Sequence, residues 1–438
     1  MKTTYRILAQ NQYMSNDTHA TGLNNNDLIV GPSGAGKTRG YVMPNIMQAN
    51  ESMVIADTKN SLYVTMGGYL RRHGCEVVNI DLTDTLHSDG YNPLDYIRCD
   101  HGKYNEQDIL TLCAALVPLE NSKEPYWERS ARTLLASLVG YVLESLPQEE
   151  HTLEYVLKLF TAESERQPGS SSPQLVFREL LRQLGAENPD SFAYRQFLLY
   201  SMVQGADRTD ACILSFLSEK LAPMSYNGPV HMFNNPKRID FAELGRRKTV
   251  VFLNISDTDR SMDGLANVFY TQALHTLCSS ADKDYPDHRL PVPVRFILDD
   301  FATNARIPDF DKIISVIRSR EIYVSIILQS ISQLESIYTP SESATIINNC
   351  DNCLYLGGQD VQTANYMAAK ANKTADTILA MPLDRAYLFT RGQKPREARK
   401  FDLCSHQAYH ELQGAFAHTG KDADTAWNDG PGEEATPC

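Results

Sequence analysis

The chain has 438 residues, of which 42% are apolar and 22% are charged, a composition typical of a globular protein with roughly two or three domains. Its formal net charge is −13, because 54 acidic residues outnumber 41 basic ones. This charge argues against a protein coated with nucleic acid, although it allows a transient DNA contact through a local basic patch. The sequence contains no run of about 18 apolar residues that would span a bilayer and no secretory signal at its start, so we expect a cytoplasmic chain.

Nine cysteines are scattered without a paired pattern, which is typical of a reducing compartment. Cys350 and Cys353 form a CxxC sequence, but a zinc site normally needs a second pair of ligands at suitable spacing. No such pair lies nearby. We therefore favour two ordinary residues at the start of a strand over a zinc site.

The first part of the chain alternates short apolar runs with helical patterns. Strands are predicted at 28–30, 53–56 and 77–80, with a helix at 62–71 between the second and third. This alternation is typical of a parallel sheet with helices on its faces. The fold class predicted is therefore α/β.

Between residues 104 and 226 the apolar spacing becomes helical, and no convincing strand appears. Three such stripes consist of Ile109, Leu112, Cys113 and Leu116, then Ala131, Leu134, Leu135, Leu138, Val142 and Leu143, then Leu153, Val156, Leu157 and Phe160. Apolar residues three and four apart lie on one face of a helix. We predict an all-α domain inserted into the α/β domain.

Strand patterns return in the second half of the chain. Strands are predicted at 249–255, 294–298, 322–328 and 353–356, with 386–390 as the last strand, and helices at 265–277, 309–318 and 361–371. Apolar strands of this kind are buried on both faces of a sheet. The predicted domains are 1–103 and 236–412 for the nucleotide-binding domain, 104–235 for the all-α insertion, and 413–438 for an acidic, disordered tail.

One segment carries a specific phosphate-binding motif. Residues 31–38 match GxxxxGK[ST] in full, with a strand before and a helix after. The nucleotide-binding residues predicted are Gly31, Ser33, Gly34, Ala35, Gly36, Lys37 and Thr38. Glycines let the backbone approach phosphates, and the amides at the helix N-terminus face negative charge. The two correct flanks argue strongly against a chance glycine-rich turn.

Individual side chains of this motif have expected roles toward ATP and Mg²⁺. Lys37 reaches the β- and γ-phosphates, and the Thr38 hydroxyl ligates Mg²⁺. Pro44 lies in the helix that follows and is expected to kink it.

A second motif follows the strand at 294–298. Asp299 and Asp300 are adjacent carboxylates at its end, where like charges and burial are costly without a function. We expect Asp299 to serve as a metal ligand and Asp300 to polarise the attacking water, with an exposed turn as the less favoured alternative. Gln329 ends the next strand, where a γ-phosphate sensor and a plain polar terminus are equally compatible with the sequence.

Two arginines bracket the end of the helix at 309–318. Arg320 is placed to complement the negative pole of that helix. Arg318 is a candidate for a trans-acting residue that enters a neighbouring subunit's site.

Together these motifs resemble the type IV coupling proteins, the TraG/TraD-type ATPases of conjugative DNA transfer and type IV secretion. The resemblance runs from about residue 7 to 403. It rests on residues 31–38, 57–59 (Asp-Thr-Lys), 298–302 (Leu-Asp-Asp-Phe-Ala), 307–310 (Ile-Pro-Asp-Phe), 318–321 (Arg-Ser-Arg-Glu), 327–330 (Ile-Leu-Gln-Ser) and 356–358 (Leu-Gly-Gly).

The resemblance implies a RecA-like P-loop NTPase domain with an inserted all-α domain, assembled as a homo-hexamer with ATP sites between subunits. It implies catalytic roles for Lys37, Asp299, Asp300, Gln329 and the trans-acting Arg318. Asp57 and Lys59 match a loop that is structural or adjacent to the site. The implied partners are single-stranded DNA, a relaxase or other protein cargo, and type IV secretion channel components at the inner membrane, with the chain docked peripherally at its cytoplasmic face.

Two features depart from the family pattern. Many members have Asp-Glu where this chain has Asp299 and Asp300, and the shorter side chain puts the rate of turnover in question. Members also commonly carry N-terminal transmembrane helices, which this sequence lacks. An ATP-switched substrate receptor with little hydrolysis, and a soluble duplex-DNA pump of the FtsK/HerA kind, therefore stay open as alternatives.

Two basic groups are candidates for DNA contact: Arg246, Arg247 and Lys248, and then Arg391, Lys394, Arg396, Arg399 and Lys400. We favour solvated turns over DNA sites for both, since single-strand binding usually adds stacking aromatic residues to positive charge.

Overall fold

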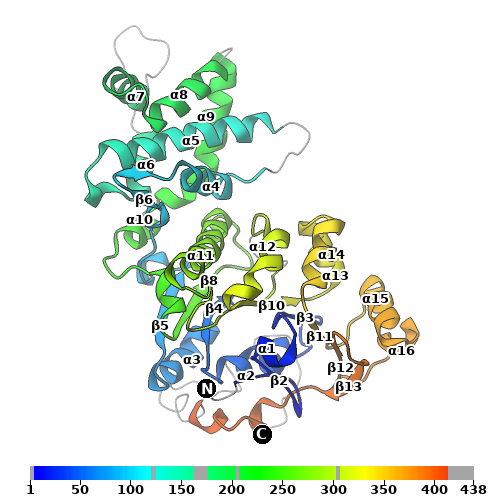
Figure 1. Cartoon of the computed structure of the whole chain (residues 1–438). Coiled ribbons are helices and arrows are strands. Elements are labelled where there is room, and N and C mark those ends of the chain that lie inside the picture. The colour runs from blue at the N-terminus through cyan, green and yellow to red at the C-terminus, as the bar shows by residue number, and fades with distance from the viewer. Residues whose placement is uncertain (1–3, 120–124, 162–175, 204–206, 302–305, 413–438) are drawn as a thin grey trace. The chain divides into compact units, whose positions relative to one another are not determined.

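The computed structural model describes residues 4–119, 125–161, 176–203, 207–301 and 306–412 (Figure 1). The predicted disordered tail, residues 413–438, lies outside the described residues, as does Ala302 of the second motif. The chain forms two compact units. The first comprises Met1–Asp81, Asp240–Thr258 and Leu274–Cys438, and the second comprises Leu82–Ile239 and Asp259–Ala273. The domain limits predicted from the sequence stay a prediction.

The first unit is built on a nine-stranded sheet with the order β13-β12-β11-β3-β10-β9-β4-β8-β5. Its strands are β3 (Asp27–Val30), β4 (Ser52–Asp57), β5 (Glu76–Asp81), β8 (Thr249–Asn254), β9 (Val294–Leu298), β10 (Ile322–Leu328), β11 (Asn352–Tyr355), β12 (Arg385–Thr390) and β13 (Arg396–Arg399). All neighbours are parallel except β11–β12 and β12–β13. The predicted α/β class with a mostly parallel central sheet is confirmed.

The sheet extends beyond the predicted last strand. Residues 396–399 form β13, which pairs antiparallel with β12, so the prediction that 386–390 is the last strand is wrong. Only Ala398 of β13 is buried, while Arg396, Glu397 and Arg399 are exposed. An edge strand of this kind is charged, and therefore lacks the apolar run by which strands are recognised. The hairpin of β1 (Tyr5–Ala9) and β2 (Gln12–Ser15) was also not predicted.

Helices cover both faces of the sheet (Figure 1). In the first unit they are α1 (Thr18–Thr21), α2 (Met43–Ile46), α3 (Ser61–Arg72), α12 (Phe310–Val316), α13 (Ile331–Ile337), α14 (Pro340–Asn348), α15 (Val361–Ala371) and α16 (Ala375–Leu379). Helix α11 (Asp263–Asp284) contributes residues to both units.

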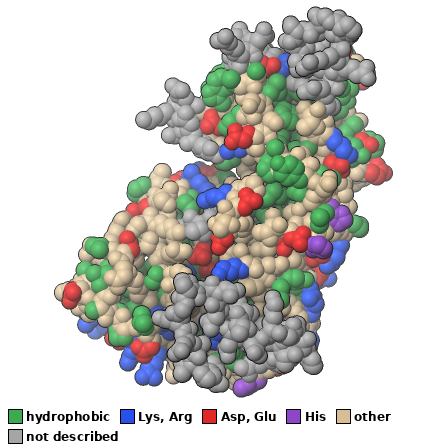
Figure 2. Space-filling view, turned by 180° about the vertical axis from the view of Figure 1, so that it is seen from behind, with side chains coloured by type: hydrophobic (Ala, Val, Ile, Leu, Met, Phe, Trp, Pro, Cys, Tyr) green, Lys and Arg blue, Asp and Glu red, His purple; other side chains and the backbone are tan. Residues whose placement is uncertain are grey.

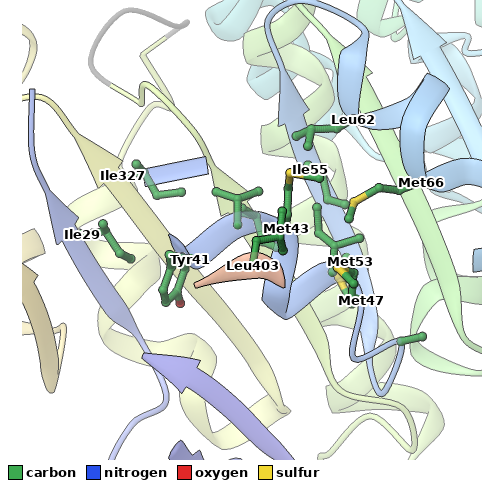
Figure 3. Packing of buried hydrophobic residues seen from close by; sticks show 14 of the residues in the cluster. Ile29, Tyr41, Met43, Met47, Met53, Ile55, Leu62, Met66, Ile327 and Leu403 are labelled. Atoms are coloured by element: carbon green, nitrogen blue, oxygen red, sulfur yellow. The ribbon is translucent and has the colours of Figure 1, made fainter. Parts of the chain in front are cut away.

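One face of the sheet packs on a large apolar cluster (Figure 3). Alternate strand residues such as Ile29, Ile55 and Ile327 point to it, because successive side chains of a strand face opposite sides. Tyr41 and Met43 enter it from the chain that follows the P-loop, and Leu403 enters from the segment after β13. The helical residues that follow the P-loop and the segment that follows β13 therefore pack in the same apolar cluster.

Where the structure describes the second unit, its only strands are the two-residue β6 (Cys99–Asp100) and β7 (Lys103–Tyr104), and its other regular elements are helical. Its helices are α4 (Glu106–Leu116), α5 (Tyr126–Ser145), α6 (Leu153–Thr161), α7 (Val176–Glu187), α8 (Phe192–Val203), α9 (Asp207–Leu221) and α10 (Asn227–Asn234). The three predicted apolar stripes lie on α4, α5 and α6 and are buried there. No described helix of the chain is long and apolar enough to cross a bilayer.

Candidate nucleotide-binding site

The P-loop follows β3 and is held tightly at its first glycine. The N–H of Gly31 donates to Leu328 O at 3.0 Å, at the end of the neighbouring strand β10. A Cβ atom on Gly31 would lie only 2.9 Å from Leu356 Cβ. Gly31 is therefore required by the close packing of the loop on the residue that follows β11, and Leu356 belongs to one of the segments that carried the family resemblance.

The rest of the loop presents backbone donors to open space. Gly34 and Gly36 have φ values of +75° and +86°, and a Cβ on either would meet nothing within 4 Å. Among the described residues, no acceptor is found for the N–H groups of Gly34, Gly36 and Lys37. Unpaired donors at a helix N-terminus form an anion-binding site. Ser33 is exposed in the same loop.

The expected kink in the following helix takes the form of a π-helical turn. Thr38–Val42 forms this turn, and the short helix α2 follows it with Pro44 in its first turn. Proline lacks an N–H and clashes with the preceding turn of an α-helix. A wider π turn next to it is one of the known ways in which a helix accommodates such a break.

Lys37 is buried and folds back on its own loop. Its ammonium donates to the carbonyl oxygens of Gly31 at 2.9 Å and Pro32 at 3.1 Å. It also lies 3.9 Å from Asp300 Oδ1. The cation is thus placed between the loop and the acidic end of β9.

Asp299 meets the P-loop directly. Thr38 Oγ1 donates to Asp299 Oδ2 at 3.2 Å, and the backbone N–H of Asp300 donates to Asp299 Oδ1 at 3.0 Å. Burial is the largest cause that raises the pKa of Asp299 to about 6, and the adjacent Asp300 carboxylate also raises it, against the opposing charge of Lys37 and the hydrogen bonds from Asp300 N and Thr38. A hydroxyl and a carboxylate so placed are the ligands that Mg²⁺ prefers.

Asp300 and Gln329 complete the cluster. Asp300 has a φ of +46°, uncommon for a residue with a side chain. Gln329 follows β10, which lies between the P-loop strand β3 and the Asp299 strand β9. Its Nε2 donates to Asp300 Oδ1 at 3.4 Å. The tertiary structure therefore favours a site role for Gln329 over a plain polar strand end.

Arg318 is the one predicted catalytic side chain that is not part of this cluster. It lies on the helical turn Ile317–Arg320 and is exposed, and no hydrogen bond or ion pair joins its side chain to a described residue. Arg320 differs: it pairs with Asp282 at 2.9 Å and donates to Val316 O at 2.9 Å. Arg320 thus complements the end of α12, as predicted.

Three aromatic side chains, Phe301, Phe310 and Tyr338, pack together beside the second motif. The rings of Phe301 and Tyr338 stack with centroids 5.7 Å apart, and the Phe310 ring lies 5.1 Å from that of Phe301. Tyr338 accepts from Ile307 N at 3.0 Å and donates to Ile307 O at 3.2 Å. Phe301 and the family-like segment 307–310 therefore fix the chain on both sides of residues 302–305.

Asp57 has a structural role. Its carboxylate accepts from the N–H groups of Ser61 at 3.1 Å and Tyr63 at 3.0 Å, and so caps the first turn of α3. Lys59 is exposed. Cys353 lies in β11 and Cys350 just before it, at the start of that strand as predicted, and both are buried.

Most of the basic candidates for DNA contact form ion pairs or hydrogen bonds with other residues of the chain. Arg246 pairs with Glu243, Arg247 with Glu76, and Lys248 donates to Ala49 O. In the second group, Arg391 pairs with Asp351 and Arg399 lies 3.9 Å from Asp384, while Lys394 and Arg396 are exposed.

Lys400 is placed elsewhere than the sequence suggested. Its Nζ donates to the P-loop carbonyl of Ala35 at 2.8 Å. A contact between residues 365 positions apart gives no local signal in the sequence. The segment of Lys400 is brought to the loop by the pairing of β13 with β12 and by the contacts of Gln10 with Arg399 and Asp402.

The donor set fits a nucleotide phosphate with Mg²⁺. The loop supplies backbone N–H groups and an ammonium, and Thr38 and Asp299 supply oxygen ligands on the same side. Residues Gly31, Ser33, Gly34, Ala35, Gly36, Lys37 and Thr38 would hold the phosphates, and Thr38 and Asp299 the metal.

The sequence matches a family of conjugative transfer proteins and two kinds of curated relatives. Residues 4–376 match the family described as "Type IV secretory system Conjugative DNA transfer". Protein VirD4 of Agrobacterium fabrum is 23% identical over 351 residues, which are 78% of this chain and 48% of that protein. Conjugal transfer protein TraG of Escherichia coli is 31% identical over 121 residues, which are 27% of this chain and 18% of that protein. The chain thus spans at most about half the length of these relatives.

Solved structures agree on the fold. The bacterial conjugative coupling protein TrwB superposes with a TM-score of 0.65 at 15% identity, covering 91% of this chain and 90% of that one. VirB4 of Thermoanaerobacter pseudethanolicus superposes with a TM-score of 0.52 at 12% identity, covering 91% of this chain and 96% of that one. Since the family match extends over most of the chain, from the N-terminal hairpin to α16, the protein belongs to the type IV secretory system conjugative DNA transfer family.

Proposed function

We propose that this chain is an ATPase that couples ATP hydrolysis to the entry of DNA, or of a relaxase bound to DNA, into a type IV secretion channel. One observation carries the proposal. The P-loop, Gln329 and Asp299 follow β3, β10 and β9, which are adjacent parallel strands. Their functional groups therefore meet at the carboxyl edge of the sheet, where α/β proteins bind ligands.

Nucleotide binding is assigned to the P-loop. Phosphate oxygens of ATP accept hydrogen bonds from the backbone N–H groups of Gly34, Gly36 and Lys37. The Lys37 ammonium offsets part of their negative charge. For this, Lys37 exchanges its bonds to the Gly31 and Pro32 carbonyls for bonds to phosphate oxygens. Thr38 and Asp299 hold Mg²⁺, which offsets the negative charge of the transferred group. Among the structural neighbours, TrwB is described in complex with the ATP analogue ADPNP and with ADP and Mg²⁺, which supports these cofactors.

Hydrolysis is assigned to Asp300 and Gln329. The Asp300 carboxylate accepts a proton from the attacking water, and the Gln329 amide, already bonded to Oδ1, orients that carboxylate and the water. Aspartate is shorter than glutamate by one methylene. The positive φ of Asp300 sets the direction in which that shorter side chain projects.

Arg318 is assigned to a neighbouring subunit's site in a homo-hexamer. Its exposure and its lack of partners among the described residues leave it available to an adjacent copy, where it would stabilise charge on the transferred phosphoryl group. The second, helical unit is assigned to cargo recognition. The assembly would dock at the cytoplasmic face of the inner membrane through channel components.

Binding to DNA is proposed to be transient. On the face shown in Figure 2, Lys and Arg side chains are spread among Asp and Glu side chains. With a net charge of −13, the surface offers little counter-ion release to hold DNA tightly, which suits a motor that must move along its substrate.

The proposal is tested by steady-state ATP turnover over a series of protein concentrations, with and without single-stranded DNA. Lys37→Ala is the inactive variant, and Lys283→Ala, at an exposed lysine in the last turn of α11 and outside the motifs, is its control. Turnover that rises with concentration and DNA, and that disappears only in Lys37→Ala, is the expected result. Unchanged turnover in Lys37→Ala would show that the site is assigned wrongly.

Two other outcomes favour the alternative functions. Tight ATP binding with negligible turnover in every condition would favour an ATP-switched cargo receptor, for which the short Asp300 side chain is the motivation. Stimulation by duplex rather than single-stranded DNA would favour a duplex-DNA pump.

A further inference from the structure

We propose that Lys400 is a positioning residue for the P-loop, which orients the Gly36 N–H toward the nucleotide phosphates by holding the carbonyl group of the same peptide. The inference rests on the proposed nucleotide binding at residues 31–38 and assigns to that site a residue outside its sequence motifs. Lys400 was among the basic residues considered for DNA contact, but in the structure its side chain contacts the P-loop.

The contact is direct. Lys400 Nζ lies 2.8 Å from Ala35 O, and the Lys400 side chain is partly buried. The backbone N–H of Lys400 donates to Asp384 O at 2.9 Å, so the base of the side chain is fixed just before β12. A hydrogen bond from an ammonium group is stronger than one between neutral groups.

The segment that carries Lys400 is anchored on both sides of it. Gln10 N donates to Arg399 O at 3.0 Å, and Asp402 N donates to Gln10 Oε1 at 3.0 Å. Leu403 then enters the apolar cluster beside Tyr41 and Met43 (Figure 3). Lys400 therefore extends to the P-loop from a segment that packs against the helical residues directly after that loop.

Peptide geometry links the Lys400 contact to the phosphate side of the loop. The C=O of Ala35 and the N–H of Gly36 belong to one planar trans peptide and point in opposite directions. Fixing Ala35 O on Lys400 therefore directs the Gly36 N–H to the other side of the loop, where no described residue accepts it. Gly36 has a φ of +86° and no side chain to restrain this peptide, so the contact with Lys400 adds a restraint from outside the loop.

The charge of Lys400 adds to this effect. A cation at the carbonyl oxygen polarises the peptide and strengthens its N–H as a donor, since hydrogen-bonded groups in series polarise one another. Lys37 and Lys400 would thus act on the phosphates from two sides of the loop, the first by direct contact and the second through the Ala35–Gly36 peptide.

The test compares Mg-ADP binding and thermal unfolding of the full chain. Lys400→Met keeps most of the side-chain stem but removes the charge and the donor, and Lys400→Arg restores both. Lys394→Met is the matched control, because Lys394 is an exposed lysine in the turn between β12 and β13. We expect the Kd for Mg-ADP to rise about tenfold in Lys400→Met, to return part of the way in Lys400→Arg, and to stay unchanged in Lys394→Met.

Two readouts separate positioning from a merely structural role. The unfolding midpoint without nucleotide should change little in Lys400→Met, while the increase produced by Mg-ADP should shrink. Hydrogen exchange at the Gly36 amide should lose its protection by Mg-ADP. Equal affinities for Lys400→Met and Lys394→Met would overturn the proposal.

Further outcomes keep the two proposals distinguishable. If Lys400→Met does not fold, Lys400→Gln, which keeps a donor without the charge, must bind Mg-ADP more weakly than Lys394→Gln, and equal binding would again overturn the role of Lys400. Wild-type affinity in Lys37→Ala, with weak binding only in Lys400→Met, would refute the assigned P-loop site. Absence of Mg-ADP binding by the unsubstituted chain would overturn both proposals.

Discussion

Gln329 Nε2 lies 3.4 Å from Asp300 Oδ1, and this hydrogen bond joins the ends of two neighbouring strands at the point where water activation is proposed. We expect Gln329→Ala to lower kcat about tenfold to a hundredfold, with little change in Mg-ADP affinity, because the Asp300 carboxylate would lose its orienting partner. Gln362→Ala, at an exposed glutamine that bonds only to Glu335 among the described residues, is the control. A change in the Kd for Mg-ADP without a change in kcat would contradict the role.

Asp300→Asn tests the proposed proton acceptor. We expect a loss in kcat of about a hundredfold or more, since an amide does not accept the proton. Mg-ADP affinity should be unchanged or higher, because the substitution removes a negative charge near the phosphates. Asp300→Glu, which adds the methylene that many family members have, should retain turnover. Single-turnover hydrolysis with saturating ATP measures both variants, and full activity of Asp300→Asn would exclude the assignment.

The raised pKa of Asp299, about 6, predicts a pH-dependent stability of the nucleotide-free protein. Since the folded state holds this proton more tightly than the unfolded state, the free energy of unfolding should fall as pH rises from about 4 to 6, by about 2 kcal/mol, and then level off. Chemical denaturation at several pH values measures the change. In Asp299→Asn the decline should be smaller, because burial also raises the pKa of Asp57, whereas the exposed-residue control Asp257→Asn should retain the whole decline.

The same carboxyl group sets the pH dependence of metal binding. Mg²⁺ needs the ionised form of Asp299, so we expect the affinity for Mg-ADP to weaken as pH falls below about 6. Calorimetry in buffers with different heats of ionisation would detect the release of the proton. Affinity that does not vary between pH 5 and pH 7.5 would contradict the assignment of Asp299 as a metal ligand.

Gly31→Ala tests why the P-loop begins with glycine. The new Cβ would lie 2.9 Å from Leu356 Cβ and 3.0 Å from Ala35 Cβ, so we expect a loss of about 1–3 kcal/mol in unfolding free energy and weaker nucleotide binding. Gly68→Ala is the matched control. Gly68 is exposed in α3 and its Cβ would approach only the tip of Arg72, so this change should stabilise the helix by about 0.5–1 kcal/mol.

Arg318 is tested by mixing two inactive variants. Arg318→Ala should bind Mg-ADP normally but lose about a thousandfold in turnover, while Lys37→Ala should not bind. If Arg318 acts in trans, mixed assemblies contain interfaces that join an intact P-loop to an intact Arg318, and turnover should partly recover. Arg72→Ala, at an exposed arginine of α3, should have normal turnover alone. Absence of recovery in assemblies shown by mass measurement to be mixed would argue against action in trans.

Local patterns in the sequence were sufficient to predict most strands of the sheet and to recognise both nucleotide motifs. Strands such as β4, β8 and β10 are buried along their whole length and mostly apolar. Burial on both faces leaves an apolar run that can be recognised without a structure. The P-loop is equally local, because its phosphate donors are consecutive amides. The charged edge strand β13 was missed for the converse reason: its environment is solvent on most sides and leaves no such run.

The tertiary structure decided which distant residues act together. The order of β3, β10 and β9 in the sheet places Gln329 beside Asp300. The return of β13 along β12 and the packing of the segment after it bring Lys400 to Ala35. Sequence patterns report the environment of each residue along its own helix or strand, whereas a contact across 365 positions is set by sheet order and by the shared apolar cluster. The sequence motifs therefore determined the residues of the proposed nucleotide site, and the fold determined which residues outside those motifs contact it.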